Sequence, residues 1–345
     1  MSLFSNLVIP PLSVAYRAVT ALRTAAYEKG LLKTTRLPVP VISIGNITAG
    51  GTGKTPLVAW ISRVVANEGR KVCVLTRGYR RANAQQRIVV SDGSNVLADV
   101  AQSGDEPFWL AQSLRGVAVV CDPDRAAAGL WAISNLGSEV FVLDDGFQHL
   151  QLARDLNIIA IDATDPWGGE RLLPNGRLRE SPRGVSRADC AIITRAEQGP
   201  GTLAIKNQLQ ELLGDRPIFT SQMQTHRIRC LGSAQTDSSG AIPQPILAFC
   251  AIGNPSSFFN HLRKEGLEVT HTRAFPDHYK YKHEDIAALS NDAKNLGAAS
   301  LITTAKDEVK LREFDFELPC YVVDIKISID HEDELRELIR NAITH

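Results

Sequence analysis

Residues 48–55 form a glycine-rich segment whose residue types suit the binding of a nucleotide phosphate chain. In order they are Thr48, Ala49, Gly50, Gly51, Thr52, Gly53, Lys54 and Thr55. Glycines let backbone N–H groups turn inward around phosphate oxygens, Lys54 can reach the β- and γ-phosphates, and the Thr55 hydroxyl can bind Mg²⁺. Thr48 stands where the strict G-x-x-x-x-G-K-[ST] pattern has its first glycine. The alternative is a flexible glycine turn followed by a surface lysine.

The residues on either side favour the phosphate loop. Before it, the β-branched run from Val39 to Ile44 predicts a buried strand. After it, Pro56 suits the first turn of a helix, where its missing N–H has no intrahelical partner. A strand, a phosphate loop and a helix N-terminus therefore follow one another in the order that phosphate binding requires.

Acidic residues follow a second apolar run. Four apolar residues precede Asp144, as in a strand whose terminal carboxylate binds Mg²⁺ beside the loop threonine. Asp145, Gln148 and His149 come next and could hold water, metal or substrate. The alternative for these strand-terminal residues is capping of the next helix.

Two adjacent carboxylates, Asp105 and Glu106, stand between a glycine and a proline at the start of a predicted helix. In isolation they suit a helix N-cap with proline in the first turn. In a chain with a phosphate loop, an aspartate at such a junction is also a candidate base or metal ligand. The spacing alone leaves both interpretations open.

Basic residues in two other segments could meet an anionic substrate. Arg77 follows the predicted strand 71–76, where it pairs with phosphate or caps a helix. The irregular stretch 163–187 is longer than packing requires, and such loops are usually functional or mobile. It carries Arg179 and Glu180, which could contact an anionic or sugar substrate.

One histidine in the second half of the chain has polar neighbours. His278 lies between Asp277 and Tyr279, in a connection between predicted elements. A lone histidine is usually structural, whereas this setting suits a catalytic residue facing an interdomain cleft. The two interpretations are balanced.

The order of the predicted elements indicates an α/β fold, with a P-loop NTPase-like α/β/α main domain and a second, smaller α/β domain. Strand and helix patterns alternate up to about residue 217 and then restart. We therefore predict an N-terminal amphipathic helix region at 1–38, the nucleotide-binding kinase domain at 39–217, a smaller domain closing the active-site cleft at 218–328, and a C-terminal helix at 329–345. An exposed connection is expected at 230–244. Helices are predicted at 255–264 and 283–296, and 306–308 are interpreted as polar cap residues after a strand.

The N-terminal region combines a two-sided helix with positive charge. One face is predicted to carry Leu12, Tyr16, Val19, Leu22 and Ala26, and the other Ser13, Arg17, Thr20 and Thr24. Residues 1–40 hold Arg17, Arg23, Lys29, Lys33 and Arg36 against Glu28. Such a helix suits the interface of an anionic membrane, and it suits packing on the protein's own core equally well. The stretch is short of the ~20 apolar residues that a spanning helix needs.

Composition narrows the class of protein. The 345 residues include 38 basic and 38 acidic ones, so a strongly basic nucleic-acid surface is not indicated. The six cysteines are widely spaced without a C-x-x-C pair, which predicts small buried hydrophobic residues in a reducing compartment. No secretory signal and no obligate protein partner are expected.

Three functions fit these features: a kinase for a membrane-borne acceptor, a kinase for a soluble small molecule, and a switch-type NTPase. A GTPase switch requires D-x-x-G after its metal-binding strand and N/T-K-x-D for guanine. Both approximations in this chain, at 144–146 and 304–307, have the wrong spacing. The two kinase hypotheses are separated by the role of the N-terminal helix.

Short segments over nearly the whole chain resemble the tetraacyldisaccharide 4′-kinases, the lipid A 4′-kinases of Gram-negative bacteria. They are, in order, GNITAGGTGKTP, TRGYRR, SGDEP, VLDDGFQH, LLPNGRLRES, AIGNPSSF, AFPDHY and TTAKDEVK. DDGFQH and the phosphate loop that starts with threonine are especially specific to that family. Ala251 stands where the family pattern has glycine.

The resemblance implies transfer of the ATP γ-phosphate to the 4′-hydroxyl of a tetraacylated disaccharide 1-phosphate, giving lipid IVA on the cytoplasmic face of the inner membrane. It implies that Asp105 is the base, with His278 oriented against it from the second domain. ATP would be held by the loop with Lys54, and Mg²⁺ by Thr55, Asp144 and Glu106. The acceptor side would include Arg77, Asp145, Gln148, His149, Arg179 and Glu180. A lipid substrate and a membrane surface are the implied partners.

Overall fold

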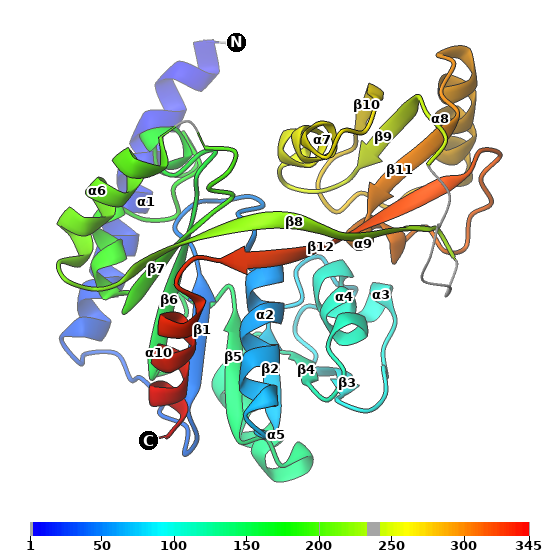
Figure 1. The fold of residues 1–345 in the computed structure, drawn as a ribbon. Coiled ribbons are helices and arrows are strands. Elements are labelled where there is room, and N and C mark those ends of the chain that lie inside the picture. The colour runs from blue at the N-terminus through cyan, green and yellow to red at the C-terminus, as the bar shows by residue number, and fades with distance from the viewer. Residues whose placement is uncertain (1–2, 200, 233–241, 345) are drawn as a thin grey trace.

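The computed structural model describes residues 3–199, 201–232 and 242–344, which form two lobes on one continuous sheet (Figure 1). The sheet has 12 strands in the order β10-β9-β11-β12-β8-β7-β6-β1-β5-β2-β4-β3. In chain order the strands are β1 (Val41–Gly45), β2 (Val72–Thr76), β3 (Ile88–Asp92), β4 (Ala118–Cys121), β5 (Val140–Asp144), β6 (Leu156–Asp162), β7 (Cys190–Thr194), β8 (Ile218–Cys230), β9 (Ile246–Cys250), β10 (Val269–Ala274), β11 (Ser300–Thr304) and β12 (Cys320–Ile329).

Ten α-helices surround this sheet among the described residues. They are α1 (Leu3–Glu28), α2 (Lys54–Asn67), α3 (Val100–Ser103), α4 (Asp105–Ser113), α5 (Arg125–Leu136), α6 (Thr202–Leu213), α7 (Pro255–Lys264), α8 (His283–Asn295), α9 (Ala305–Glu308) and α10 (Glu332–Thr344). We call the part built on β1–β7 the first lobe and the part built on β9–β11 the second lobe.

The first lobe has three layers. Every residue of its central strands β1, β2, β5, β6 and β7 is buried, as expected for parallel strands covered on both faces. Helices α2, α4 and α10 cover one face, and α5 and α6 cover the other. The carboxyl ends of these strands consequently meet at one edge, where the loops that follow β1 and β5 lie close together.

Two long strands join the lobes. The start of β8 pairs with β7 in parallel, while β12 pairs with β11 in parallel and with β8 in antiparallel orientation. In Figure 1 these two strands cross from one lobe to the other as a ribbon. The chain then returns to the first lobe, because Leu335, Ile339 and Ile343 of α10 pack in the core that contains α2.

Several local predictions are confirmed, and others need correction. Helix α7 has the predicted bounds, and α8 ends one residue before its predicted end. Edge strands β3 and β10 were not predicted, since their short sequences mix apolar and polar residues and lack a long apolar run. The connection expected at 230–244 has its central part, 233–241, outside the described residues. Five cysteines are buried as predicted, but Cys230 is exposed.

Helix α1 turns much of its apolar surface to solvent. Leu12, Val19 and Leu22 are exposed by 51%, 65% and 74%, so they do not pack on the protein's own core. Ser13, Thr20 and Thr24 lie on the half-buried side. The predicted faces are wrong in detail, because Tyr16 and Ala26 are half-buried with these polar residues whereas Arg17 is exposed. In the described part of the chain, no helix is long and apolar enough to cross a membrane.

Candidate active site

The phosphate loop links β1 to the first turn of α2. Gly53 precedes the helix in the left-handed conformation, at φ 75°, which glycine adopts without steric cost. The loop is fixed from two sides: Thr194 Oγ1 donates to the Thr52 carbonyl at 2.8 Å, and Arg177 Nε donates to the Ala49 carbonyl at 2.9 Å. This support holds the loop in one shape while its end, with Thr55, lines a cleft.

Lys54 lies between the phosphate loop and the end of β5. Its Nζ donates to Asp145 Oδ1 and to Asn46 Oδ1, both at 2.6 Å. Arg179 Nη1 donates to Asp145 Oδ2 at 2.7 Å. Burial favours the neutral acid, but Lys54 and Arg179 together hold the pKa of Asp145 well below its usual range. Asp145 is therefore an anion that orients two cations.

The long loop after β6 brings Arg179 and Glu180 to this point. Gln148 Nε2 donates to Glu180 Oε1 at 2.7 Å and to the Asn46 carbonyl at 2.8 Å. Arg187 completes the network with an ion pair to Glu180 at 2.6 Å. Four residues predicted for the acceptor side, Asp145, Gln148, Arg179 and Glu180, thus form one hydrogen-bonded group.

Asp144 ends β5 and is 5% exposed. Thr76 Oγ1 donates to its Oδ2 at 3.0 Å. Burial and the negative charges of Glu106 and Asp145 raise the pKa of Asp144 to about 6. The carboxylates of Asp144 and Glu106, predicted as metal ligands, therefore lie close enough to repel each other.

Asp105 and His278 meet across the two lobes. His278 Nδ1 and Asp105 Oδ1 are 2.6 Å apart, and the two side chains are 11% and 5% exposed. Asp105 begins α4 in the first lobe, whereas His278 follows β10 in the second lobe and has a left-handed backbone at φ 61°. A non-glycine residue in this region is often held there by a functional site.

Four further charged groups surround this pair. Lys306 Nζ donates to Glu106 Oε1 at 3.0 Å, and Lys310 Nζ lies 3.5 Å from Asp105 Oδ2. Asp277 Oδ2 lies 3.5 Å from His278 Nε2. We call Asp105, Glu106, Asp277, His278, Lys306 and Lys310 the interlobe cluster. Burial opposes ionisation of Asp105, but the hydrogen bond from His278 and the charges of Lys306 and Lys310 hold its pKa well below the usual range.

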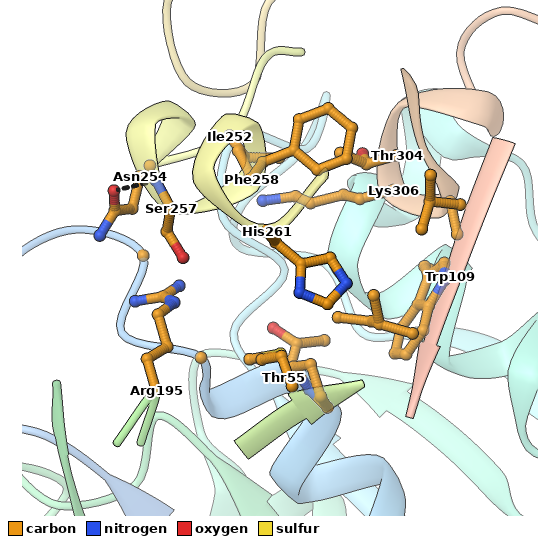
Figure 2. Close-up of a pocket in the computed structure, with 18 of the residues that line it drawn as sticks. Thr55, Trp109, Arg195, Ile252, Asn254, Ser257, Phe258, His261, Thr304 and Lys306 are labelled. Carbon is orange, nitrogen blue, oxygen red and sulfur yellow. Dashed lines mark hydrogen bonds between the residues drawn. The ribbon is translucent and has the colours of Figure 1, made fainter. Parts of the chain in front are cut away.

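The cleft between the lobes opens from the end of the phosphate loop (Figure 2). Its apolar walls include Trp109, Met223, Ile252 and Phe258. Its polar lining residues include Thr55, Arg195, Asn254, Ser257, His261 and Lys306. The lobes touch at two glycines, since a Cβ built on Gly253 would lie only 2.4 Å from the Gly51 nitrogen. The mainly apolar cleft is therefore continuous with the phosphate loop.

Two predicted residues lie apart from these groups. Arg77 is exposed and, among the described residues, makes no hydrogen bond to another predicted site residue. Burial and the charges of Arg125 and Arg154 lower the pKa of His149 to about 4. Within the described chain, His149 Nε2 is buried without a hydrogen-bond partner. His149 is thus a neutral imidazole beside the network rather than a member of it.

Sequence reasoning missed three residues of the site. Asn46 binds Lys54, and Lys306 and Lys310 flank Asp105. Lys306, Asp307 and Glu308 were interpreted as polar cap residues, but the N-cap of α9 is Thr304, whose hydroxyl accepts a hydrogen bond from the Asp307 N–H at 3.0 Å. The sequence did contain a signal for Lys306, because this lysine comes just after a buried strand, much as Asp144 stands at the end of one.

Comparisons with known proteins cover nearly the whole chain. A family model described as tetraacyldisaccharide-1-P 4′-kinase matches residues 5–344. A tetraacyldisaccharide 4′-kinase from Desulfotalea psychrophila is 38% identical over 330 residues, which are 94% of this chain and 94% of that protein. Another from Pelobacter propionicus is 41% identical over 311 residues, which are 90% of this chain and 84% of that protein.

A solved structure is similar over both lobes. LpxK from Aquifex aeolicus, crystallised in complex with ATP, is 32% identical to this chain and matches it with a TM-score of 0.77. The match covers 99% of this chain and 100% of that one. The similarity therefore includes the phosphate loop, the interlobe cluster and the strands that connect them.

Proposed function

This chain belongs to the tetraacyldisaccharide 4′-kinase family, and from that premise we propose which of its residues carry the reaction. The enzyme transfers the γ-phosphate of ATP to the 4′-hydroxyl of tetraacyldisaccharide 1-phosphate and so forms lipid IVA in lipid A biosynthesis. Family membership excludes the alternative hypothesis of a kinase that acts on a soluble small molecule. The single observation that supports the assignment of roles is the 2.6 Å contact between Asp105 and His278 beside the phosphate loop.

Asp105 is the base toward the 4′-hydroxyl, and His278 orients it. Asp105 is a weak proton acceptor in this setting, because His278, Lys306 and Lys310 lower its pKa. Phosphoryl transfer through a loose transition state needs little proton removal before the phosphorus–oxygen bond breaks. The carboxylate therefore mainly aligns the hydroxyl by accepting its hydrogen bond, and the Asp105–His278 pair takes the proton as the new bond forms.

The phosphate loop, residues 48–55, holds the ATP phosphates. Its backbone N–H groups and the N-terminus of α2 favour an anion. Lys54 supplies a positive charge at the β- and γ-phosphates, and Asp145 and Asn46 orient its ammonium group. The apolar walls of the cleft beyond Gly51 and Gly53 suit the planar base of the nucleotide.

Thr55, Asp144 and Glu106 would hold Mg²⁺. Their oxygen atoms are the hard ligands that Mg²⁺ prefers, and a divalent cation would relieve the repulsion that raises the pKa of Asp144. In the described chain, no cluster of three or more His, Cys, Asp or Glu side chains could hold a metal alone. This agrees with an ion bound by one or two carboxylates together with substrate phosphates. Held by these residues, Mg²⁺ would supply positive charge that offsets the negative charge of the transferring phosphates.

The network around Asp145 forms the acceptor side of the site. Arg179, Gln148 and Glu180 are fixed by mutual hydrogen bonds, so they present donors and acceptors in a defined geometry to a sugar. Among the described residues, the side chains of Arg77 and His149 make no hydrogen bond to this network, and we assign them to the remainder of the proposed acceptor surface. The 1-phosphate of the acceptor explains the arginines of this surface in a protein with no net charge.

The acceptor reaches the enzyme through α1, which lies on the cytoplasmic face of the inner membrane. The exposed leucines and valines of α1, with Arg17 and Arg23 beside them, suit the interface of an anionic bilayer. We expect Leu22→Glu to weaken binding to phosphatidylglycerol vesicles in a sedimentation assay. Leu130→Glu, at an exposed site on α5, is the matched control. Equal sedimentation of both variants would contradict this role of α1.

The proposed base is tested by Asp105→Asn in a radiolabelled ATP assay with tetraacyldisaccharide 1-phosphate in mixed micelles. The expected loss in kcat is roughly 10²–10⁴-fold, the usual contribution of general acid–base catalysis. ATP affinity should change little, because Asp105 lies outside the phosphate loop. Asp315→Asn, at an exposed aspartate of the second lobe, should transfer phosphate normally. Near-normal turnover of Asp105→Asn would remove Asp105 from the base role.

A further inference from the structure

Lys306 extends from a rigid support in the second lobe. It lies in the short helix α9, which directly follows β11. Asp307, 0% exposed, accepts hydrogen bonds from the Ala251 N–H at 3.1 Å and the Tyr281 hydroxyl at 3.2 Å. The backbone under Lys306 is therefore fixed, while its long side chain reaches across to a carboxylate of the first lobe.

The Lys306 ammonium group lies among carboxylates of both lobes. Its Nζ is 3.0 Å from Glu106, 3.7 Å from Asp277 and 4.0 Å from Asp105. Burial opposes the charge, but these carboxylates raise the pKa of Lys306, so it stays an ammonium at neutral pH. Its nearest partner, the Glu106 side chain, is 32% exposed. A partly exposed carboxylate is a partner that Lys306 can exchange for another anion.

Lys310 offers an internal comparison within the same cluster. Its side chain is 8% exposed, and its Nζ lies 3.1 Å from the buried Asp307 and 3.5 Å from Asp105. It does not line the cleft, whereas Lys306 does, together with Thr55 and Gly51. Figure 2 shows the Lys306 side chain extending into the cleft from the wall opposite Thr55. The two lysines therefore supply similar charge to Asp105, but only Lys306 faces the space beside the phosphate loop.

We propose that Lys306 is a catalytic residue that binds the γ-phosphoryl oxygens of ATP during transfer, from the side opposite Lys54. This proposal rests on the assignment of Asp105 as the base, which places the acceptor hydroxyl beside the same cluster. Lys54 is held on the first lobe by Asp145 and Asn46. Lys306 comes from the second lobe, so the γ-phosphoryl group receives its second ammonium group only where the lobes meet.

The proposed role of Lys306 adds no bond-making or bond-breaking step to phosphoryl transfer. The bond between the γ-phosphorus and the oxygen bridging to the β-phosphate breaks, and a bond from the acceptor 4′-oxygen forms. The hydroxyl proton passes to the Asp105–His278 pair. Lys306 keeps its protons and only exchanges a hydrogen bond to Glu106 for one to a phosphoryl oxygen, where it stabilises charge in the transition state.

The decisive experiment compares Lys306→Met, Lys306→Arg and Lys310→Met by binding and kinetics. ADP lacks the γ-phosphoryl group, whereas ADP with aluminium fluoride mimics that group in transfer. For Lys306→Met we expect ADP affinity within about twofold of wild type and loss of the extra affinity that fluoride confers. We also expect kcat to fall by roughly 10²–10³-fold, the effect of removing one transition-state donor. Lys306→Arg should recover part of both quantities.

Lys310→Met should keep the aluminium fluoride complex, because that side chain does not face the cleft. Removing its charge should instead raise the pKa of Asp105 and move the acidic limb of the pH–rate profile upward. The proposal is overturned if Lys306→Met binds the fluoride complex like wild type, or if Lys310→Met loses it equally. An active Asp105→Asn beside an impaired Lys306→Met would refute the base assignment alone, so the two failures are distinguishable.

Discussion

The phosphate loop and the interlobe cluster are built in opposite ways. The loop is one contiguous segment, and its binding groups are mainly backbone N–H groups fixed by β1 and α2. The interlobe cluster draws charged side chains from α4, from the connection after β10 and from α9. Asp105 and Lys310 are 205 positions apart in the chain, yet their charged groups lie 3.5 Å apart.

This difference implies that the phosphate loop and the interlobe cluster contribute to different steps, the loop to phosphate binding and the cluster to phosphoryl transfer. A loop held within one lobe can bind phosphates whether or not the second lobe is in place. A cluster shared by two lobes exists only when they approach, so it can make the chemical step depend on closure. Changes in the loop should therefore affect phosphate binding and turnover together, whereas changes at the contact between the lobes should affect turnover more than phosphate binding.

Among the variants that compare the phosphate loop with the contact between the lobes, Lys54→Ala is expected to give the largest effect. It removes a cation at the transferring phosphate and leaves Asp145 with Arg179 as its remaining ionic partner. We expect kcat/KM to fall by about 10³-fold and ATP affinity to fall with it. Isothermal calorimetry and the transfer assay measure the two quantities, with Lys206→Ala at an exposed site on α6 as control. Unchanged ATP affinity in Lys54→Ala would contradict the proposed role of the phosphate loop in nucleotide binding.

Gly253→Ala tests the other side of the comparison. The added Cβ would lie 2.4 Å from the Gly51 nitrogen, so the lobes must separate to admit it. We expect kcat to fall by about 10²-fold, the effect of a displacement near 1 Å on a reaction that depends on positioning. The thermal midpoint should change little, since the core of each lobe is intact.

Gly201→Ala is the matched control for this variant. Among the described residues, a Cβ on Gly201 would meet only the Ala204 methyl, at 3.9 Å, so the substitution fits there without movement. Small-angle scattering of both variants would show whether Gly253→Ala has more widely separated lobes. Normal turnover in Gly253→Ala would mean that the contact between the lobes is not needed for transfer.

The contrast between the contiguous phosphate loop and the interlobe cluster also explains which features could be predicted from the sequence. The loop at 48–55, Asp144 after its strand and the bounds of α7 depend on neighbouring residues, so local patterns indicated them. The partners of Asp105 depend on how β8 and β12 join the lobes, which no local pattern encodes. Lys306 was therefore interpreted as a cap residue, although its ammonium group reaches the carboxylates of α4.

The N-terminal helix α1 shows a second limit of prediction from the sequence. Periodicity predicted a two-sided helix, but it placed Tyr16, Ala26 and Arg17 on the wrong faces and could not show which face would meet the protein. Ser13 donates to the Leu172 carbonyl at 3.4 Å, and Arg23 donates to the Gln148 carbonyl at 3.2 Å. These contacts with distant loops set the rotation of α1. They leave Leu22 and Val19 exposed.

The smallest expected effect is a pH dependence of the free energy of unfolding that arises from His149. This histidine lies beside the network around Asp145 in the first lobe, so its protonation should not depend on closure of the two lobes. Its native pKa is about 4 against an ordinary value of 6.5, so the unfolded chain binds more protons between these values. The free energy of unfolding should therefore decrease as pH falls from 6.5 to 4, by about 2 kcal/mol after allowance for partial exposure. His149→Asn should remove this part of the slope in urea titrations, whereas His226→Asn, at an exposed site, should not. An identical slope in His149→Asn would show that other groups take up the protons. The same slope with and without Lys306→Met would show that the first lobe titrates independently of the interlobe cluster.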